Sequence, residues 1–272
     1  MAAYKAAETT PAAVRSVLAQ THVDWELIIA SDCGTDYLAL CHAKGIRDGR
    51  IRMVATPSIG AGPSAARNAA LATAQGDYLA NLDSDDIWLP KKLSALLPLA
   101  MESGLACDNT CAVRPDGTVV TTAHPVGDTP QVIDALAMMN SGVPHFPLLR
   151  RELAGPGYRA DLRFAEDVVF NMEAIARAGG MTLLPQCLTH YIQRPDSASN
   201  HPDAWRRADA AYGQILELLQ LDELTVPAGQ HADIVAAIAA KRALNQAYGA
   251  AVAAGGGMSF QDFAAQRNRQ PD

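Results

Sequence analysis

The amino-acid sequence predicts an α/β protein: a mostly parallel sheet with flanking helices, a small hairpin and a helical C-terminal extension. Three observations support this fold class. Helix and strand patterns alternate over residues 10–82, the apolar strand segments end in polar turns, and the chain beyond about residue 203 is rich in alanine and helical in pattern. Such alternation is typical of parallel sheets, because the chain must cross back between neighbouring parallel strands.

Helical and apolar segments take turns in the first half of the chain. Helices are expected over residues 10–20, 37–44 and 64–74, and strands over residues 25–30, 51–55 and 78–82. Thr10 and Pro11 mark the first helix, because a capping residue followed by proline is a typical helix start. Ligands of such sheets bind beyond the carboxyl ends of the strands. Asp32 and Asp83 are expected at that edge.

The second half is less regular. Pro115, Asp116 and Gly117 predict a hairpin between strands over residues 106–113 and 118–123. The remaining expectations are a helix that begins at Thr129, a strand over 146–149, a helix over 166–178 and helices from about residue 203. No internal repeat or clear linker interrupts the sequence, which indicates one continuous domain with a helical extension.

Composition excludes several classes of function. The chain has 272 residues, of which 49% are hydrophobic, and its formal net charge is -7. A nucleic-acid binder normally shows a basic stripe, so this charge argues against one. We see no apolar run of the roughly 18 residues that a membrane span needs and no apolar segment of a signal peptide. The five cysteines are irregularly spaced, which favours reduced thiols and a cytoplasmic location.

Three carboxylates lie within four residues at the end of the third strand: Asp83, Asp85 and Asp86. Their mutual repulsion would raise their pKa values. A Mg²⁺ or Mn²⁺ ion would relieve that repulsion, since such ions bind one or two carboxylates together with substrate phosphates. The other interpretation is a solvated acidic turn in which Asp86 only caps the next helix. The motif by itself fits both.

Asp32 and Arg67 have two interpretations each. Asp32 could accept a hydrogen bond from a nucleobase edge, or it could form an Asx-turn that holds Gly34. Arg67 follows the start of a helix, whose terminal amides favour anions. It could reach a diphosphate or brace the acidic cluster, although an isolated arginine on a helix is more often a surface residue.

Glu166 and Asp167 open the helix over residues 166–178. Acidic residues in a first turn usually complement the helix dipole. A paired catalytic role is the alternative: Asp167 would be a general base, and Glu166 would hold it or contact the acceptor. A carboxylate base must reach the proton that it removes, and that distance depends on the tertiary structure.

Taken together, these segments resemble glycosyltransferase family 2, the inverting enzymes with the Rossmann-like GT-A fold. Six segments match the family in order: residues 2–4, 16–21, 25–36, 65–71, 82–88 and 164–167. The resemblance covers roughly residues 1–200. It implies a nucleotide-sugar half over residues 1–105, an acceptor half over 106–200 and a helical extension over 201–272.

The resemblance also implies a reaction. Asp167, next to Glu166, would deprotonate an acceptor hydroxyl, which would attack the anomeric carbon of the donor sugar with inversion. A Mn²⁺ or Mg²⁺ ion on Asp85, assisted by Asp83 or Asp86, would stabilise the departing diphosphate.

The implied substrates follow from the same family. The donor is a nucleotide-diphosphate sugar, UDP-linked, with Tyr4 and Asp32 lining the base pocket and Arg67 and Asp83 contacting the donor. The acceptor is a glycan, a lipid-linked compound or another hydroxyl compound in polysaccharide biosynthesis. A lipid acceptor would require peripheral contact with the inner face of a membrane.

The sequence departs from the family at three places. Ser31 stands where the family has the first Asp of its turn, and Lys5 stands where it usually has Asn. The chain also begins at Met1, where the family's first strand should be ending. An open edge inside a sheet would leave backbone groups unpaired. We therefore expect Met1 to be an internal methionine of a longer protein.

Three other functions compete with a transferase. A sugar nucleotidyltransferase would have a glycine-rich phosphate loop after its first strand, but residues 5–16 contain no glycine. A haloacid-dehalogenase-type phosphatase would use Asp83 as nucleophile, and Asp86 fits that motif poorly. The third alternative is an inactive remnant that binds the donor without turnover.

Overall fold

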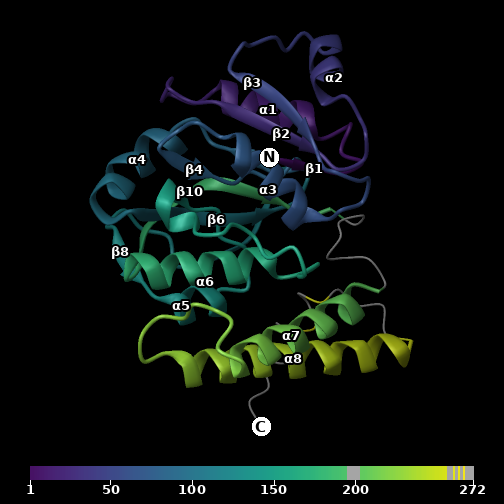
Figure 1. Ribbon diagram of the computed structural model, residues 1–272, viewed down its shortest axis with the longest axis vertical. Helices are drawn as coiled ribbons and strands as arrows, with labels where there is room; N and C mark the ends of the chain where they lie inside the picture. Colours follow the sequence, from purple (N-terminus) through teal and green to yellow (C-terminus); the bar gives the residue numbers. More distant parts are fainter. Residues whose placement is uncertain (195–202, 256–259, 261–262, 264–265, 267–272) are drawn as a thin grey trace.

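The computed structural model describes residues 1–194 and 203–255 together with residues 260, 263 and 266. These residues fold around two sheets flanked by helices, which confirms the α/β class (Figure 1). The first sheet is parallel, with the order β1-β2-β3. Its strands are β1 (Ala2–Ala3), β2 (Leu27–Ser31) and β3 (Ile51–Ala55).

The second sheet has seven strands and is mixed. Its main path is β4 (Tyr78–Ala80), β9 (Leu148–Arg150), β6 (Leu105–Val113), β10 (Met181–Ile192) and β5 (Ile87–Trp88). β7 (Val119–Thr122) pairs with β6 as the predicted hairpin, and β8 (Gln131–Ile133) pairs with β10. Among the strands that the structure describes, only β6 and β10 are parallel neighbours in this sheet. The expected single sheet is therefore two sheets, the second of which is largely antiparallel.

The helices of the first half lie where the sequence predicted them: α1 (Thr10–Leu18), α2 (Tyr37–Ala43) and α3 (Pro63–Thr73). Asp36 caps α2, since its side chain accepts a hydrogen bond from the Ala39 amide at 2.9 Å. Gly62 begins α3 with φ 101°, and a Cβ there would meet the guanidinium of Arg163. Only glycine adopts that backbone without strain, so the entry to α3 is set by this residue.

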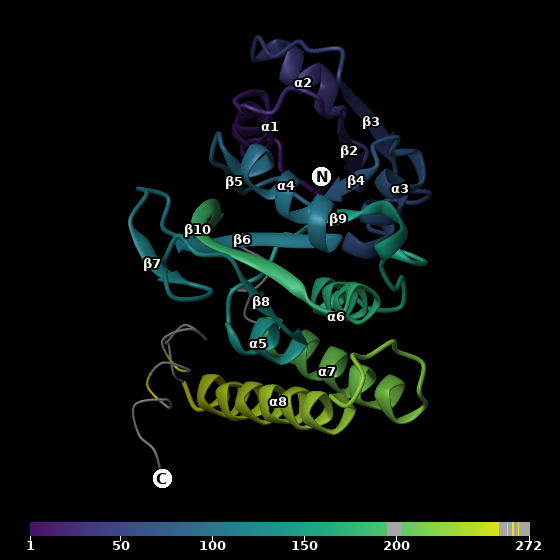
Figure 2. The ribbon, with the colours of Figure 1, turned by 90° about the vertical axis from the view of Figure 1, so that its left-hand side faces the viewer.

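Two helices cover opposite faces of the larger sheet, α4 (Lys92–Ser103) and α6 (Glu166–Ala178) (Figure 2). Successive residues of β6 point to opposite faces. Leu105 belongs to the core cluster that contains Ile175 of α6, and Ala106 belongs to the cluster that contains Leu96 of α4. Both faces of the sheet are therefore buried, and the turns that carry the site residues lie at its edge.

The helical extension packs on the α6 side. α7 (Ala204–Gln220) and α8 (His231–Ala253) form a hairpin below α5 (Ala135–Asn140) and α6. Ile215 of α7 and Ile234 of α8 share one apolar cluster with Ile175 of α6. No helix among the described residues is both long and apolar enough to cross a membrane. The boundary at residue 200 stays a prediction.

One predicted helix is wrong. Residues after Thr129 form β8 instead, because Gln131–Ile133 pair with Met181–Leu183 of β10, a contact distant in sequence. The helix α5 begins later, after Asp134, whose side chain accepts a hydrogen bond from the Ala137 amide at 2.8 Å. A short 3-10 helix, Arg151–Ala154, follows β9.

The expectation of reduced thiols is wrong for one pair. Cys111 of β6 and Cys187 of β10 form a disulfide with a Cα–Cα distance of 5.7 Å. The two residues are 76 positions apart, and they meet because β6 and β10 are neighbours in the sheet. Sequence spacing does not reveal such a meeting. Cys33, Cys41 and Cys107 are free thiols.

Candidate active site

Asp32 lies directly after β2 and organises the loop that leads to α3. Its side chain is buried and accepts hydrogen bonds from the amides of Ala61 and Gly62, at 2.8 and 2.9 Å. The hydroxyl of Thr56 donates a third, at 2.8 Å. The carboxylate therefore ties the strand end to the glycine-rich loop, a role that differs from a local turn around Gly34. A carboxylate has about four acceptor sites, so a nucleobase donor remains chemically compatible.

Arg67 joins the two acidic segments of the site. Its Nη2 atom donates to Asp83 Oδ1 at 2.9 Å, and its Nη1 atom donates to Glu166 Oε1. The side chain is only 9% exposed, so Arg67 is not the surface residue that an isolated arginine on a helix usually is. Burial lowers the pKa of Arg67, but the negative charges of Asp83 and Glu166 outweigh it and raise the pKa above its usual value. Arg67 is thus a buried cation between the acidic turn and α6.

The three carboxylates of the acidic turn have separate surroundings. Asp85 Oδ2 accepts from Arg194 Nη2 at 3.0 Å, and Asp86 Oδ1 accepts from the Ile192 amide at 2.9 Å. Burial raises the pKa values of Asp85 and Asp86, and the charge of Asp83 raises both further. Across residues 1–194 and 203–255, no three His, Cys, Asp or Glu side chains are grouped so as to hold a metal ion.

Asp167 lies beside Glu166 at the start of α6. Burial raises its pKa to about 6, and the neighbouring Glu166 charge adds to the increase while Arg67 opposes it. Ala165, the residue before α6, has φ 57°. A residue with a Cβ in this left-handed region is strained by about 1–2 kcal/mol. Such strain is concentrated at functional sites, and here it sets the direction in which α6 begins.

Tyr4 follows β1 directly, next to the end of β2 in the first sheet. The Tyr4 ring is half exposed, with the Lys5 ammonium 5.2 Å from its centroid. Cys33 Sγ accepts from the Lys5 amide at 3.2 Å and lies 3.3 Å from the Tyr37 hydroxyl. Burial raises the pKa of the Cys33 thiol, but its hydrogen bonds, with Thr35 first, outweigh burial and lower the pKa to about 7. An accessible aromatic ring beside a polar turn suits a nucleobase platform.

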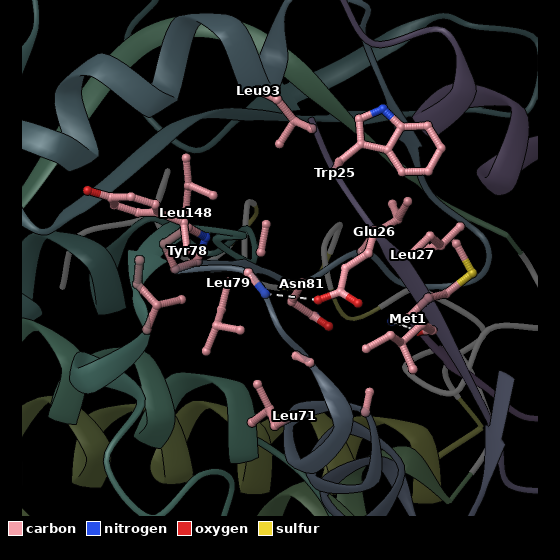
Figure 3. A pocket seen from close by; sticks show the side chains of 18 of the residues that line it. Met1, Trp25, Glu26, Leu27, Leu71, Tyr78, Leu79, Asn81, Leu93 and Leu148 are labelled. Carbon is pink, nitrogen blue, oxygen red and sulfur yellow. Dashed lines mark hydrogen bonds between the residues drawn. The ribbon is translucent and has the colours of Figure 1, made fainter. Parts of the chain in front are cut away.

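A cavity lies beside this site rather than in it. It has a volume of about 630 Å³. Figure 3 shows Leu27 of β2 and Leu79 of β4 among the side chains that line it. Trp25, Leu27 and Met1 line one side and Leu79 and Leu148 the other.

Only two predicted site residues, Arg67 and Asp167, line this cavity. The rest of the predicted set lies outside it: Tyr4, Asp32, Asp83, Asp85, Asp86 and Glu166. The cavity is therefore mainly a gap between the two sheets.

Two site residues were not predicted from the sequence. Arg194 reaches Asp85 from the end of β10, about 110 residues further along the chain. Tyr158 lies with its ring 5.2 Å from the Arg67 guanidinium, and its amide and carbonyl both bind the Asn68 side chain. Neither residue stands in a motif with characteristic spacing, so no local signal would have found it.

A comparison with protein families identifies the chain. The model described as glycosyl transferase family 2 matches residues 1–153, more than half of the sequence. The chain belongs to this family. The predicted resemblance is thereby confirmed, and a glycosyltransferase is the enzyme class that the family and its named relatives support.

Curated relatives agree with the family. The succinoglycan biosynthesis protein ExoO of Rhizobium meliloti is 32% identical over 78% of this chain and 66% of its own length. An Escherichia coli protein named UDP-Glc:alpha-D-GlcNAc-diphosphoundecaprenol beta-1,3-glucosyltransferase WfgD is 35% identical over 39% of this chain and 41% of its own length. The chain therefore spans less than two thirds of the length of these two relatives.

Solved structures share the fold. S. aureus TarS 1-349 superimposes with a TM-score of 0.65 at 18% identity, covering 87% of this chain and 68% of that chain. Its complex with UDP-GlcNAc superimposes with a TM-score of 0.67 over similar shares. At this identity the likeness establishes the architecture, which is the GT-A fold expected from the sequence.

Proposed function

We propose that this chain transfers a sugar from a UDP-linked donor to an acceptor hydroxyl with inversion, using Asp167 as general base. One observation carries the proposal. A single buried guanidinium, that of Arg67, binds both Asp83 and Glu166. The acidic turn after β4 and the first turn of α6 are therefore held at one edge of the fold, as a donor phosphate site and an acceptor base would have to be.

The base assignment rests on the contrast between two adjacent carboxylates. Glu166 is engaged by Arg67 through its Oε1 atom, and it acts on Asp167 through its charge. Asp167 has a pKa of about 6, which leaves it deprotonated near neutral pH yet more basic than an ordinary carboxylate. A general base works best when its pKa lies near the working pH. Asp167 then accepts the proton of the acceptor hydroxyl as that oxygen bonds to the anomeric carbon.

The donor set of the acidic turn suits Mg²⁺ or Mn²⁺. All the ligands on offer are carboxylate oxygens, and these ions prefer oxygen. Asp85 is about one third exposed, and Asp86 Oδ2 is buried without a hydrogen-bond partner among the described residues. One or two carboxylates with the phosphates of a donor complete such a site. A bound cation would supply positive charge to the leaving diphosphate.

The proposed substrate classes are inferred from the names of similar proteins. WfgD is named for a UDP-glucose donor and a diphosphoundecaprenol-linked acceptor, ExoO for succinoglycan biosynthesis, and TarS is solved with UDP-GlcNAc. These names support a UDP-sugar donor and a glycan or lipid-linked acceptor for this chain. The half-exposed Tyr4 and the buried Asp32 at the end of β2 would receive the uracil. A cytoplasmic location, with peripheral contact at the inner membrane face for a lipid acceptor, completes the proposal.

The test separates donor binding from turnover. Thermal shift with UDP, UDP-glucose and UDP-GlcNAc, with and without Mn²⁺, should raise the melting temperature most for one UDP-sugar with Mn²⁺. Release of UDP from that donor should then fall by about 10²-fold or more in Asp167→Asn, with the thermal shift kept. Asp128→Asn, an exposed carboxylate bonded to Gln186, is the matched control. Donor binding without UDP release in the wild-type chain would instead favour an inactive remnant.

A further inference from the structure

Arg194 follows the end of β10, and its side chain contacts the acidic turn. Its Nη2 atom is 3.0 Å from Asp85 Oδ2, and the two side chains are 27% and 30% exposed. A cation on Asp85 would bind the same carboxylate, next to the positively charged guanidinium. The guanidinium and a divalent ion are therefore competitors for one carboxylate.

The backbone below Arg194 is firmly anchored. His190 pairs with Ile87 of β5, the Ile192 amide donates to Asp86 Oδ1, and the Gln193 amide donates to the carbonyl of Val113 at 2.8 Å. Arg194 thus starts from a backbone position fixed against the acidic turn itself. Its side chain is 27% exposed, whereas the backbone that carries it is held by these hydrogen bonds.

The two arginines of the site differ in burial. Arg67 is 9% exposed and binds both Asp83 and Glu166, so it cannot leave without stranding a buried charge. Arg194 is three times as exposed, and its ion pair with Asp85 is a partly solvated one of modest strength. The phosphates of a donor carry negative charge, and the planar guanidinium binds phosphate oxygens in pairs. Of the two, Arg194 is the less buried, and its ion pair with Asp85 is the one that costs less to break.

We propose that Arg194 exchanges partners when the donor binds: it pairs with Asp85 in the donor-free enzyme and with the donor diphosphate once a divalent cation occupies Asp85. This inference rests on the proposed function. It makes cation and donor binding mutually favourable. A cation on Asp85 frees Arg194 to bind the donor diphosphate, and a donor that binds Arg194 frees Asp85 to bind the cation. Such coupling is reciprocal, so each ligand tightens the other by the same factor.

The first experiment measures the cation alone. Binding of Mn²⁺ to the full chain is followed by electron paramagnetic resonance without nucleotide, for the wild type and Arg194→Gln. Removal of the competing guanidinium should tighten Mn²⁺ binding by about 5-fold or more, which is within the usual range of a coupling between sites. A purely structural role of Arg194 would leave Mn²⁺ affinity unchanged or weaken it, and either result would overturn the proposal.

The second experiment measures UDP at saturating Mn²⁺ by calorimetry. Arg194→Gln should bind UDP about 10-fold more weakly, and Arg194→Lys should be intermediate for both ligands because it keeps the charge without the planar fork. Arg150→Gln is the control, since Arg150 is a partly exposed residue paired with Tyr78 at the opposite end of β4. Equal UDP affinity in wild type and Arg194→Gln would overturn the exchange alone. A wild-type chain that binds no UDP with any cation would instead overturn the proposed function.

Discussion

Arg67 Nη2 lies 2.9 Å from Asp83 Oδ1, and the same guanidinium also binds Glu166. The residues come from α3, the turn after β4 and the first turn of α6, so one buried side chain connects three segments. A charge this deeply buried is tolerated only when paired. Arg67 is therefore a structural residue that holds the acidic turn against the first turn of α6.

Arg67→Ala should destabilise the fold, because it leaves Asp83 and Glu166 without their cation. Removal of one partner of a buried ion pair costs about 3–5 kcal/mol. Urea unfolding followed by circular dichroism would measure it. Arg52→Ala is the comparison, since Arg52 pairs with Glu26 at a more exposed position, where about 1 kcal/mol or less is expected. Equal losses in the two variants would contradict the structural role of Arg67.

The rate of UDP-sugar turnover should depend on the protonation of Asp167. Because a base must be deprotonated, and the pKa of Asp167 is about 6, the rate should be level above that pH and fall about tenfold per unit below it. Glu166→Gln removes a neighbouring negative charge that raises this pKa. The acid limb of the profile should therefore move to lower pH, and a shift to higher pH would contradict the assignment.

The cavity between β2 and β4 should accept an added strand. The Met1 ammonium donates to the Ile28 carbonyl at its wall, and Leu27, Leu79 and Leu148 line it. A fusion of about five apolar, β-branched residues to Met1 would continue the β1–β2 pairing and fill apolar space. We expect a larger rise in melting temperature than a Gly-Ser extension of equal length gives, because both extensions remove the buried Met1 ammonium but only the apolar one adds strand contacts. Equal effects of both extensions would contradict strand addition.

The amino group of Met1 should also make the free energy of unfolding depend on pH. Burial lowers the pKa of the Met1 ammonium to about 5, and the nearby Asp83 charge only partly opposes this. The unfolded chain then binds more protons than the folded chain between pH 5 and 8, so stability rises with pH by roughly 1 kcal/mol per unit in that window. Urea midpoints at pH 6 and 8 measure this slope. Because an extension converts the amine to an amide, that part of the slope should disappear.

A second buried ion pair offers a test away from the site. Lys92 Nζ binds Asp108 Oδ1, the Thr189 hydroxyl and the Phe146 carbonyl, and neither charged side chain is exposed. Lys92→Met alone or Asp108→Leu alone should cost about 3–5 kcal/mol, and the double variant less than their sum. Thermal or urea unfolding of the three variants measures the coupling, and strict additivity would contradict it.

Much of the fold and of the site was predictable from local sequence. The strand at β2 and the helix at α3 lie where apolar pattern and the Gly62-Pro63 start indicated, because both depend on neighbouring residues. Asp167 and the acidic turn were found as short motifs in a family order, and the family is confirmed. Their catalytic and metal roles stay predictions that the variants above test.

Only the tertiary structure decided how these motifs face one another. Arg67 meets Glu166 across 99 residues of chain, Arg194 meets Asp85 across 109, and β8 forms by pairing with β10 rather than as a helix. Such contacts depend on which strands become neighbours, and local propensity does not encode that choice. The sequence by itself determined the family, the places of β2 and β3 and the acidic residues. Packing determined which guanidinium each carboxylate received, because buried charges must find partners wherever the fold brings them.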